Sequence, residues 1–312
     1  MSDKSVFKYD KLLLANGARN NKPPIGGIEK EGVFTLRKLQ NAWDIKNQIK
    51  KGEKVINIGG GIQGLETAWN LQKHGIEVAI MEFQSRLMSN QLDERASLIL
   101  QEVVEKFGIN IYLNTAAHEI VGKDRVEAVV TNSGEIFPCK GVIYAVGIKP
   151  NIEIIQDTPI KYGRGIIVNE KMETNIEDIY AAGDIAEFNS TVPGLWNISI
   201  GHGKVAGYNI AGKDSKYEHI VPVTTLNAFE LSLFSMGCVD ERKASTMLVE
   251  ESNEGQYIKV FIRDSRIIGA IVIGDTKRSP IFKSAIEKET SLQSMDLSQI
   301  TVSELLSNLQ NK

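Results

Sequence analysis

Short apolar runs alternate along this chain with amphipathic stretches, and glycines separate most of them. Apolar residues at helical spacing predict helices over 42–51, 64–74, 93–107 and 196–210. Strands that alternate with helices in this way are typical of an α/β fold with parallel sheets. The runs themselves predict strands at 11–15, 55–58, 76–81, 109–113, 141–146, 165–169 and 179–182.

The last hundred residues follow a different pattern. Residues 220–274 look β-rich, and 256–262 and 266–273 predict a hairpin around Asp264-Ser265. Two helices follow, one opened by Ser279 as N-cap before a proline, the other by a capping box at Thr301 and Glu304. We therefore expect a smaller α+β domain at the end of the chain, whereas an earlier hairpin over 126–131 and 135–139 belongs to the α/β part.

The strand at 55–58 leads into a glycine motif, Gly59-x-Gly61-x-x-Gly64, and a helix follows it. Gly59 permits a tight turn, Gly61 lets the backbone approach a pyrophosphate, and Gly64 lets helix and strand pack closely. The helix N-terminus adds partial positive charge. The alternative, a glycine-rich turn without a ligand, explains less of this context, so the motif predicts a dinucleotide site.

An acidic residue stands where a dinucleotide site requires one. Glu82 ends the next strand, 18 residues after Gly64, and can accept hydrogen bonds from the adenosine ribose. Its charge would repel a 2′-phosphate, which favours NAD(H) over NADP(H), although Arg86 four residues later acts against this preference. Glu66, expected in the first helical turn, either complements the helix dipole or lies beside the nicotinamide, and its position alone favours the dipole.

A second candidate carboxylate ends the strand at 179–182. Gly183-Asp184 is either a simple turn or an acid that binds sugar-like hydroxyls at the crevice of an α/β sheet. The other candidate groups lack a functional spacing: we expect the histidines to be structural or at the surface, the tryptophans to pack and the cysteines to be inert. These residues are His74, His118, His202, His219, Trp43, Trp69, Trp196, Cys139 and Cys238.

Composition narrows the class of protein. Hydrophobic residues make up 42% and charged residues 24% of the chain, which is ordinary for globular proteins. The net charge, 36 − 39 = −3, gives no basic field for nucleic acid or an anionic membrane, and no apolar run approaches the roughly 20 residues of a membrane span. The two cysteines form no CxxC pair and no metal site is visible, which predicts a reduced, cytoplasmic protein.

The order of the motifs resembles that of the two-dinucleotide-binding flavoproteins, the pyridine nucleotide-disulfide oxidoreductases. Within that family the chain is most similar to NADH–rubredoxin reductases and to the flavoprotein portion of the nitrite reductase large subunit, whose C-terminal domain resembles residues 260–276 here. The motifs are YDKLLLANG at 9–17, Leu36-Arg37, GGGIQGLE at 59–66, YAVGIKPN at 144–151 and TNIEDIYAAGD at 174–184.

The resemblance implies two interleaved Rossmann-like domains and a C-terminal domain: a partial FAD-binding domain at 1–32 and 151–212, an NAD-binding domain at 33–150, and an α+β domain at 213–312. It places the catalytic Glu66 near the nicotinamide and Asp184 on the ribityl chain of FAD. It also implies further cofactor-binding residues: Gly59, Gly61, Ile62, Gln63, Gly64 and Glu82 for NADH, Gly147 and Gly183 along the crevice, Ala15 and Gly17 beside the FAD phosphates and adenosine, and Leu195, Trp196 and Asn197 at the flavin pyrimidine end.

The implied activity is that of a flavoenzyme. Hydride would pass from NADH to FAD, and electrons would continue to rubredoxin, another small carrier protein or a small-molecule acceptor. The family's first GxGxxG unit, which binds the ADP half of FAD, is not found before Tyr9, so we expect weakened FAD binding and an uncovered sheet edge. The chain would then be a natural truncation, one part of a split protein or the product of a mis-started reading frame. The alternative is a truncated, non-catalytic NAD(H)-binding module or a subunit that needs a partner to complete the flavin site. The partner expected for the chain is a second copy in a homo-oligomer or a complementing subunit.

Overall fold

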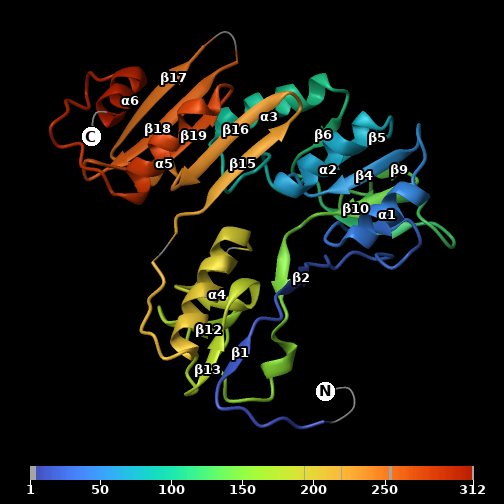
Figure 1. Ribbon diagram of the computed structural model, residues 1–312. Coiled ribbons are helices and arrows are strands. Elements are labelled where there is room, and N and C mark those ends of the chain that lie inside the picture. Colours follow the sequence, from blue (N-terminus) through green and yellow to red (C-terminus); the bar gives the residue numbers. More distant parts are fainter. Residues whose placement is uncertain (1–4, 193, 219, 253–254, 311–312) are drawn as a thin grey trace. The chain divides into compact units, whose positions relative to one another are not determined.

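The computed structural model describes residues 5–192, 194–218, 220–252 and 255–310. The chain divides into two compact units (Figure 1). Unit 1 consists of residues up to 21 together with 147–220, and unit 2 consists of residues 22–146 together with those from 221 onward. The three-domain division at 32, 150 and 212 stays a prediction. No helix among the described residues is both long and apolar enough to cross a bilayer.

Unit 2 contains a five-stranded parallel sheet that confirms the predicted α/β architecture. Its central strands are buried on both faces, which explains their nearly continuous apolar sequences. The sheet order is β3 (Val33–Phe34), β10 (Gly141–Tyr144), β4 (Lys54–Ile58), β5 (Glu77–Met81) and β6 (Asn110–Tyr112), and the helices of this part are α1 (Leu39–Gln48), α2 (Ile62–Lys73) and α3 (Glu94–Lys106).

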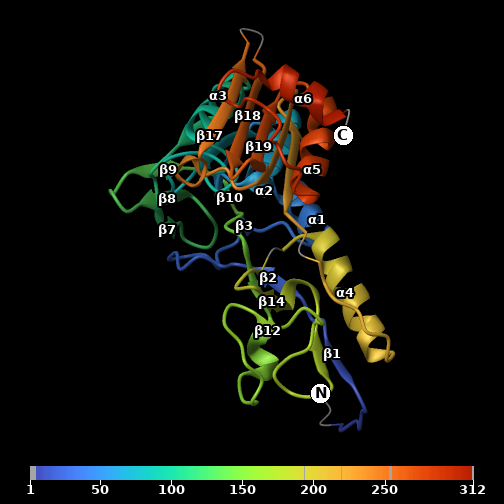
Figure 2. The same ribbon diagram turned by 90° about the vertical axis from the view of Figure 1, so that its left-hand side faces the viewer.

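Two antiparallel sheets complete unit 2. The C-terminal sheet lies between α3 on one face and α5 and α6 on the other (Figures 1 and 2), and its residues alternate between the two cores: Phe261 and Ile271 pack toward α3, and Val260 and Val272 pack toward α5 and α6. The small sheet consists of β7 (Ala117–Val121), β8 (Ala128–Thr131) and β9 (Ile136–Pro138). The C-terminal sheet has the order β15 (Val223–Ala228), β16 (Leu231–Gly237), β19 (Arg266–Ile273), β18 (Tyr257–Arg263) and β17 (Thr246–Glu251), followed by α5 (Ser279–Glu287) and α6 (Val302–Gln310).

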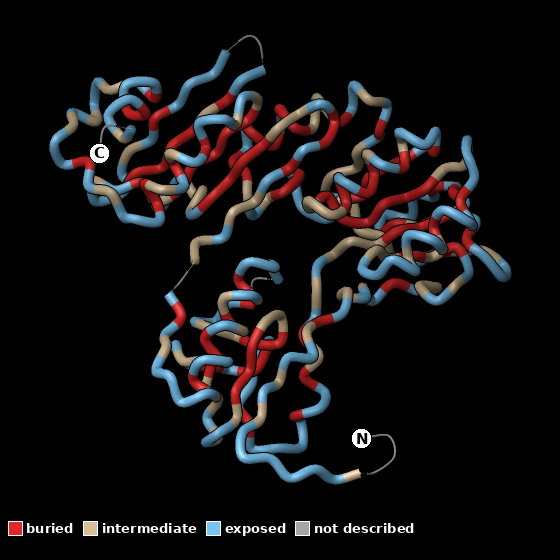
Figure 3. Tube along the Cα trace, in the orientation of Figure 1, coloured by how far each residue is buried: buried red, intermediate tan, exposed pale blue. Residues whose placement is uncertain are grey.

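One apolar core joins the dinucleotide part of unit 2 to the C-terminal sheet. Trp69 of α2 packs against Phe107 and Phe229, with ring centroids 4.8 and 5.0 Å away. Leu92 and Leu100 share this core with Phe261. Figure 3 shows the buried residues gathered along the strands. A large apolar interface of this kind holds the two parts of unit 2 as one body.

Unit 1 is built from strand pairs and one long helix, α4 (Trp196–Ile210), whose bounds agree with the prediction. Within the described residues β1 pairs with β13 on one side and with no strand on the other. The sheet edge expected from a missing unit stays a prediction. The pairs are β1 (Leu12–Leu14) with β13 (Ile179–Ala181), β2 (Ala18–Asn20) with β11 (Ile148–Pro150), and β12 (Ile166–Val168) with β14 (Ala186–Phe188).

Three predicted helix starts were displaced, and one of them is that of α2, which begins at Ile62 rather than 64. Helix α1 begins at Leu39 rather than 42, because the Asn41 side chain accepts hydrogen bonds from the backbone N–H groups of Arg37 and Lys38 and caps the chain earlier. Ser279 is the first residue of α5 and not its N-cap, since a short 3₁₀ turn over Thr276–Arg278 runs directly into the helix. The capping box is confirmed, with reciprocal bonds between Thr301 and Glu304.

Candidate dinucleotide-binding site

The glycine turn between β4 and α2 has the backbone geometry that the motif predicts. Gly59 adopts φ +112°, which L side chains rarely take, and a Cβ there would lie 2.5 Å from the carbonyl oxygen of Ala145. A Cβ on Gly64 would overlap the Gly59 carbonyl oxygen. Both glycines are therefore required for the chain to turn tightly and for α2 to approach β4, as the sequence predicts.

Gly61 is the glycine with free space around it. A Cβ at this position would meet no atom of the described residues within 4 Å. Gly61 is also the N-cap of α2, and no side chain caps the helix there, so the N–H groups of its first turn, Ile62 to Gly64, have no side-chain acceptor. An open helix N-terminus with free space in front of it suits an anion such as a pyrophosphate.

Glu82 is held in a fixed orientation at the end of β5. Its carboxylate accepts a hydrogen bond from the Gly60 N–H at 2.5 Å and another from the Gln84 N–H at 2.7 Å. The structure thus brings Glu82 directly beside the glycine turn. Each carboxylate oxygen keeps further acceptor capacity for a hydroxyl group.

Asn57 is a residue of this turn that sequence reasoning missed. It is fully buried in β4, and its Nδ2 donates to the Gly59 carbonyl oxygen at 2.9 Å, while its Oδ1 is buried without a partner in the structure. The signal was present: one amide interrupts the otherwise apolar sequence 55–58. Buried amides are costly unless they are bonded, so this side chain indicates a turn whose carbonyl orientation matters.

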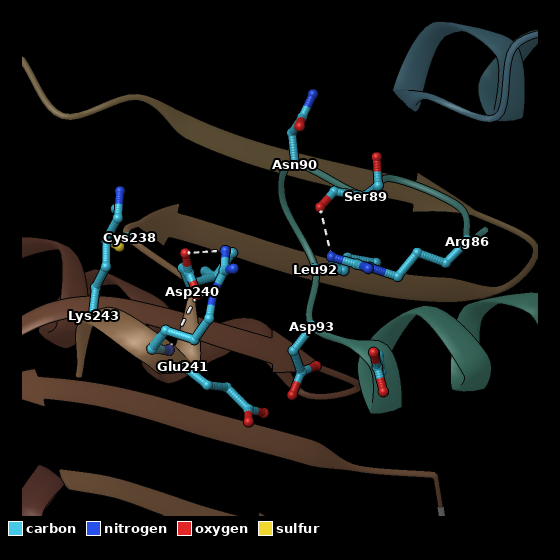
Figure 4. A pocket seen from close by; sticks show the side chains of 13 residues that line it. Arg86, Ser89, Asn90, Leu92, Asp93, Cys238, Asp240, Glu241 and Lys243 are labelled. Carbon is cyan, nitrogen blue, oxygen red and sulfur yellow. Dashed lines mark hydrogen bonds and ion pairs between the residues drawn. The ribbon is translucent and has the colours of Figure 1, made fainter. Parts of the chain in front are cut away.

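Arg86 is turned away from the role of a phosphate ligand. Its Nη2 donates to the Ser89 carbonyl oxygen at 3.1 Å, and its Nε is buried without a partner in the structure. Figure 4 shows the side chain lying along a cavity of about 750 Å³ whose other wall is residues 237–243. Because Arg86 contacts Ser89, Glu82 provides the charge beside the glycine turn.

Glu66 lies one turn further along α2 than expected. The helix begins at Ile62, so Glu66 opens the second turn and lies beyond the strongest part of the helix dipole. Although the residue is exposed, its side chain faces a largely apolar groove of about 600 Å³ between α1 and α2, and partial burial raises the pKa of its carboxyl group. Its role beside a nicotinamide stays a prediction.

The other candidate residues lie in unit 1, at the carboxyl ends of two parallel strands. Leu14 of β1 accepts a hydrogen bond from the N–H of Ala182, so exposed Ala15 lies beside the start of the Gly183-Asp184 turn. The Asp184 carboxylate accepts a bond of 3.1 Å from the Ser199 hydroxyl of α4. A half-buried carboxylate at this edge suits a polyhydroxyl chain.

The start of α4 resembles the start of α2 in its chemistry. Leu195 is the N-cap, and no side chain caps the helix. The N–H groups from Trp196 onward are available to partial negative charge. Trp196 is 87% exposed, so the expectation that it packs is wrong: as the first residue of the helix it projects beyond the elements that bury the later turns. Trp69 does pack, whereas Trp43 is exposed, with Lys46 over its ring, so the expectation that Trp43 packs is wrong as well.

The remaining candidates are two glycines and side chains expected to be structural or inert. Gly17 and Gly147 both have positive φ, and their carbonyl oxygens accept bonds from Asn151 and Asn21 within unit 1. His202 is buried against Tyr217, and burial lowers its pKa to about 4, while burial raises the pKa of Cys139 to about 11. His219 lies outside the described residues. Among those described, no three His, Cys, Asp or Glu residues are grouped as metal ligands.

Comparison with known proteins supports the resemblance on which these residues were chosen. The model of the pyridine nucleotide-disulphide oxidoreductase family matches residues 2–203, and that of the rubredoxin NAD+ reductase C-terminal domain matches residues 222–290. NADH-rubredoxin oxidoreductase of Clostridium acetobutylicum is 35% identical over 93% of this chain and 72% of its own length. Nitrite reductase [NAD(P)H] of Bacillus subtilis is 34% identical over 97% of this chain, which spans only 38% of that protein.

Solved structures agree with the sequence relatives. The crystal structure of the Clostridium NADH:rubredoxin oxidoreductase aligns with 96% of this chain and 74% of its own, with a TM-score of 0.78 and 34% identity. A NAD-dependent persulfide reductase from A. fulgidus aligns with 97% of this chain and 63% of its own, with a TM-score of 0.85 and 27% identity. The chain therefore belongs to the pyridine nucleotide-disulphide oxidoreductases, a family of flavin-dependent NAD(P)H enzymes whose cofactors are FAD and NAD(H).

Proposed function

We propose that this chain is an NADH:acceptor oxidoreductase that works with FAD. The observation that carries the proposal is the turn at Gly59–Gly64, where free space, an open helix N-terminus and an oriented carboxylate meet. FAD, when bound, would accept hydride from the nicotinamide and release electrons one at a time or in pairs. The first turn of α2 binds the pyrophosphate of NADH, and Glu82 accepts from its adenosine ribose.

The remaining roles are assigned to residues on both units. In unit 1 Asp184 binds the ribityl chain of FAD, and the open start of α4 stabilises negative charge on the ring. Glu66 lies near the nicotinamide, where its partly desolvated carboxyl group orients the ring or handles a proton. Exchange of Glu66→Gln should then slow flavin reduction at saturating NADH while leaving the NADH dissociation constant within twofold.

The proposed acceptor is a small electron-carrier protein of the rubredoxin type. The match of residues 222–290 to the rubredoxin NAD+ reductase C-terminal domain supports it, as does the Clostridium relative. We also propose a cytoplasmic location, because neither Cys139 nor Cys238 forms a disulfide. Glu82 makes NADH the preferred donor, since a 2′-phosphate would face its charge.

The test begins with the purified full chain. It should bind NADH by fluorescence titration, show yellow flavin absorbance after incubation with FAD, and reduce a dye and then rubredoxin with NADH. Protein that binds NADH but reduces dyes and not rubredoxin would refute the acceptor and keep the oxidoreductase. A chain that binds neither nucleotide would refute the whole proposal.

A second candidate function is an NAD(H)-binding subunit whose flavin site is completed by another polypeptide. The β1–β13 pair favours it, because a two-stranded parallel sheet is rare and the Leu13 side chain on β1 is 38% exposed. Under this proposal, a separate polypeptide with a glycine-rich βαβ unit adds to β1 and restores FAD binding. FAD binding by the chain alone, unchanged by such a polypeptide, would exclude it.

A further inference from the structure

An ionic cluster with a buried lysine and a buried aspartate joins the dinucleotide part of unit 2 to the C-terminal sheet. Lys259 on β18 donates to Asp93 Oδ2 at 2.8 Å and also contacts Glu241. The Tyr257 hydroxyl donates to the same Asp93 oxygen at 2.7 Å. The side chains of Lys259 and Asp93 are only 9% and 4% exposed. These four residues are named the Asp93 cluster below.

The cluster is tied to the start of α3. Asp93 is the N-cap of that helix, and its Oδ1 accepts from the Ala96 N–H at 2.9 Å. One carboxylate therefore uses one oxygen for the helix and the other for two donors of the C-terminal sheet. Burial acts to lower the pKa of Lys259, but the bonds to Asp93 and Glu241 outweigh it and raise that pKa, so the amine stays charged. Loss of Lys259 would leave a buried carboxylate without its cation.

The segment before Asp93 runs directly back to the glycine turn. The Met88 N–H donates to the Gly60 carbonyl oxygen at 3.0 Å, and a Cβ on Gly60 would lie 2.6 Å from the Leu87 side chain. The buried Ser97 hydroxyl of α3 donates to the Leu87 carbonyl oxygen at 2.9 Å. Residues 82–93, the adenosine loop, are thus packed against the turn at one end and fixed to α3 at the other.

The C-terminal sheet contacts the adenosine loop through a hydrogen bond and a shared apolar core. The Ser235 hydroxyl on β16 donates to the Gln91 carbonyl oxygen at 2.5 Å, and Leu87 and Leu92 share a core with Phe261. Elsewhere the loop and residues 237–243 are separated by the cavity in Figure 4, where side chains do not fill the space. The polar connection between loop and sheet therefore depends on the Asp93 cluster and the Ser235 contact.

We propose that Lys259 and Tyr257 are positioning residues for NAD(H): they act through Asp93 to hold the adenosine loop, and with it the Glu82–Gly60 contact, in the geometry that binds the nucleotide. The inference rests on the proposed function, because it takes the glycine turn as the NAD(H) site. It gives the C-terminal domain a second role besides partner recognition, since ordering the loop before the ligand arrives removes part of the entropic cost of binding.

The experiment compares Lys259→Met with the wild-type chain and with Lys283→Met, an exposed lysine of α5 that serves as the matched control. NADH dissociation constants are measured by fluorescence titration, and hydrogen exchange is followed over 82–93. We expect NADH binding to weaken about fivefold in Lys259→Met, the lower end of couplings between separate sites. Exchange should rise in the adenosine loop and stay unchanged in β4, and the control should match the wild-type chain in both.

Two further variants keep the test independent of folding defects. Tyr257→Phe removes a single hydroxyl and should weaken NADH binding about threefold, within the range of one lost hydrogen bond. In Asp93→Asn combined with Lys259→Met, the effects on binding should be smaller than the sum of the single effects. Folded variants that bind NADH as tightly as the wild-type chain overturn the positioning role alone. A wild-type chain that binds no NADH overturns the proposed function as well.

Discussion

The two units hold their candidate residues in different ways. In unit 2 the glycine turn follows a strand that has neighbours on both sides in a five-stranded sheet, and Gly59, Gly60 and Gly64 are buried. In unit 1 the strand before Gly183 pairs, within the described residues, with the short strand β1 and through an isolated bridge with Glu173, and Ala15, Trp196 and Asn197 are exposed. The glycine turn of unit 2 is therefore held by buried neighbours, whereas the candidate residues of unit 1 lie at a surface.

The difference affects the entropic cost of binding a nucleotide at each unit. A preformed turn loses little entropy when its ligand binds, whereas groups at an open sheet edge must be ordered by the ligand or by another polypeptide. We therefore expect NADH to bind to unit 2 whether or not FAD is present. FAD, by contrast, should stabilise unit 1 when it binds.

The largest loss of stability is expected from a side chain that fills the glycine turn of unit 2. In Gly64→Val the new side chain meets the Gly59 carbonyl oxygen and the Asn57 amide, both of which are buried and fixed. Overpacking against backbone should lower the free energy of unfolding of unit 2 by about 4 kcal/mol, above the usual cost of overpacking in a core. Denaturant unfolding followed by tryptophan fluorescence measures it, and NADH binding should be lost.

The matched control lies in unit 1. Gly203 is also a helical glycine, but no atom of the described residues outside its own helix turn lies within 4 Å of a Cβ there. Gly203→Val should change stability by no more than about 1 kcal/mol. If both variants lost the same free energy of unfolding, the glycine turn would be no more tightly packed than α4. Unit 2 would then hold its candidate residues no more firmly than unit 1 does.

Acid should weaken unit 1 before unit 2. His202 is buried beside Tyr217, and burial lowers its pKa from 6.5 to about 4. The unfolded chain therefore binds a proton that the folded chain does not, so stability is complete above about pH 6.5 and falls as the pH drops toward 4. The difference between these two pKa values corresponds to a loss of roughly 3 kcal/mol.

Hydrogen exchange of α4 compared with that of α2, measured between pH 7 and pH 4.5, tests this expectation. His202→Gln should remove most of the pH dependence of α4, whatever it does to stability at neutral pH. His74→Gln is the control, because His74 is an exposed histidine at the end of α2. An unchanged pH dependence in His202→Gln would mean that other groups of unit 1 cause the acid sensitivity.

Much of this comparison could be predicted from the sequence, because local chemistry determines it. The glycine spacing and the apolar strands each have one physical reason that acts over a few residues, and α4 agrees with its predicted bounds. The position of Glu82 beside the turn follows from parallel strands that end at the same edge of a sheet. The placement of Glu82 beside the glycine turn was therefore predictable.

The rest depended on contacts between distant residues. Asp93 was recognised only as the start of a helix, and nothing in the sequence places Lys259, 166 residues later, on its free oxygen. Trp196 was expected to pack because tryptophan usually does, but its burial depends on what lies beyond the helix start. Glu66 was assigned to the wrong turn, since the helix start at Ile62 depends on Gly61 as N-cap.

A smaller change separates binding from folding within the turn. Gly61→Ala adds one methyl group where the structure has free space, and the backbone of Gly61 at φ −79° suits alanine. The free energy of unfolding should change by less than about 0.5 kcal/mol. NADH should bind about tenfold more weakly, because the methyl group holds the pyrophosphate away from the helix N–H groups, where charge-assisted bonds contribute about 1.5–3 kcal/mol each. Calorimetric titration measures the affinity, and unchanged binding would show that the phosphates lie elsewhere.

The smallest expected effect concerns the choice of nucleotide. Glu82→Gln removes the negative charge beside the turn but keeps one carbonyl oxygen as acceptor for Gly60 or Gln84. NADPH binding should improve relative to NADH by about fivefold, as expected when repulsion of roughly 1 kcal/mol between nearby solvated charges is removed. The ratio should respond to salt in the wild-type chain and less in the variant, since screening acts only on the charge. Glu77→Gln, at the exposed start of the same strand, is the control and should leave the ratio unchanged. If Glu82→Gln also leaves it unchanged, the carboxylate serves the turn alone, and unit 2 is preformed in shape but not in nucleotide selectivity.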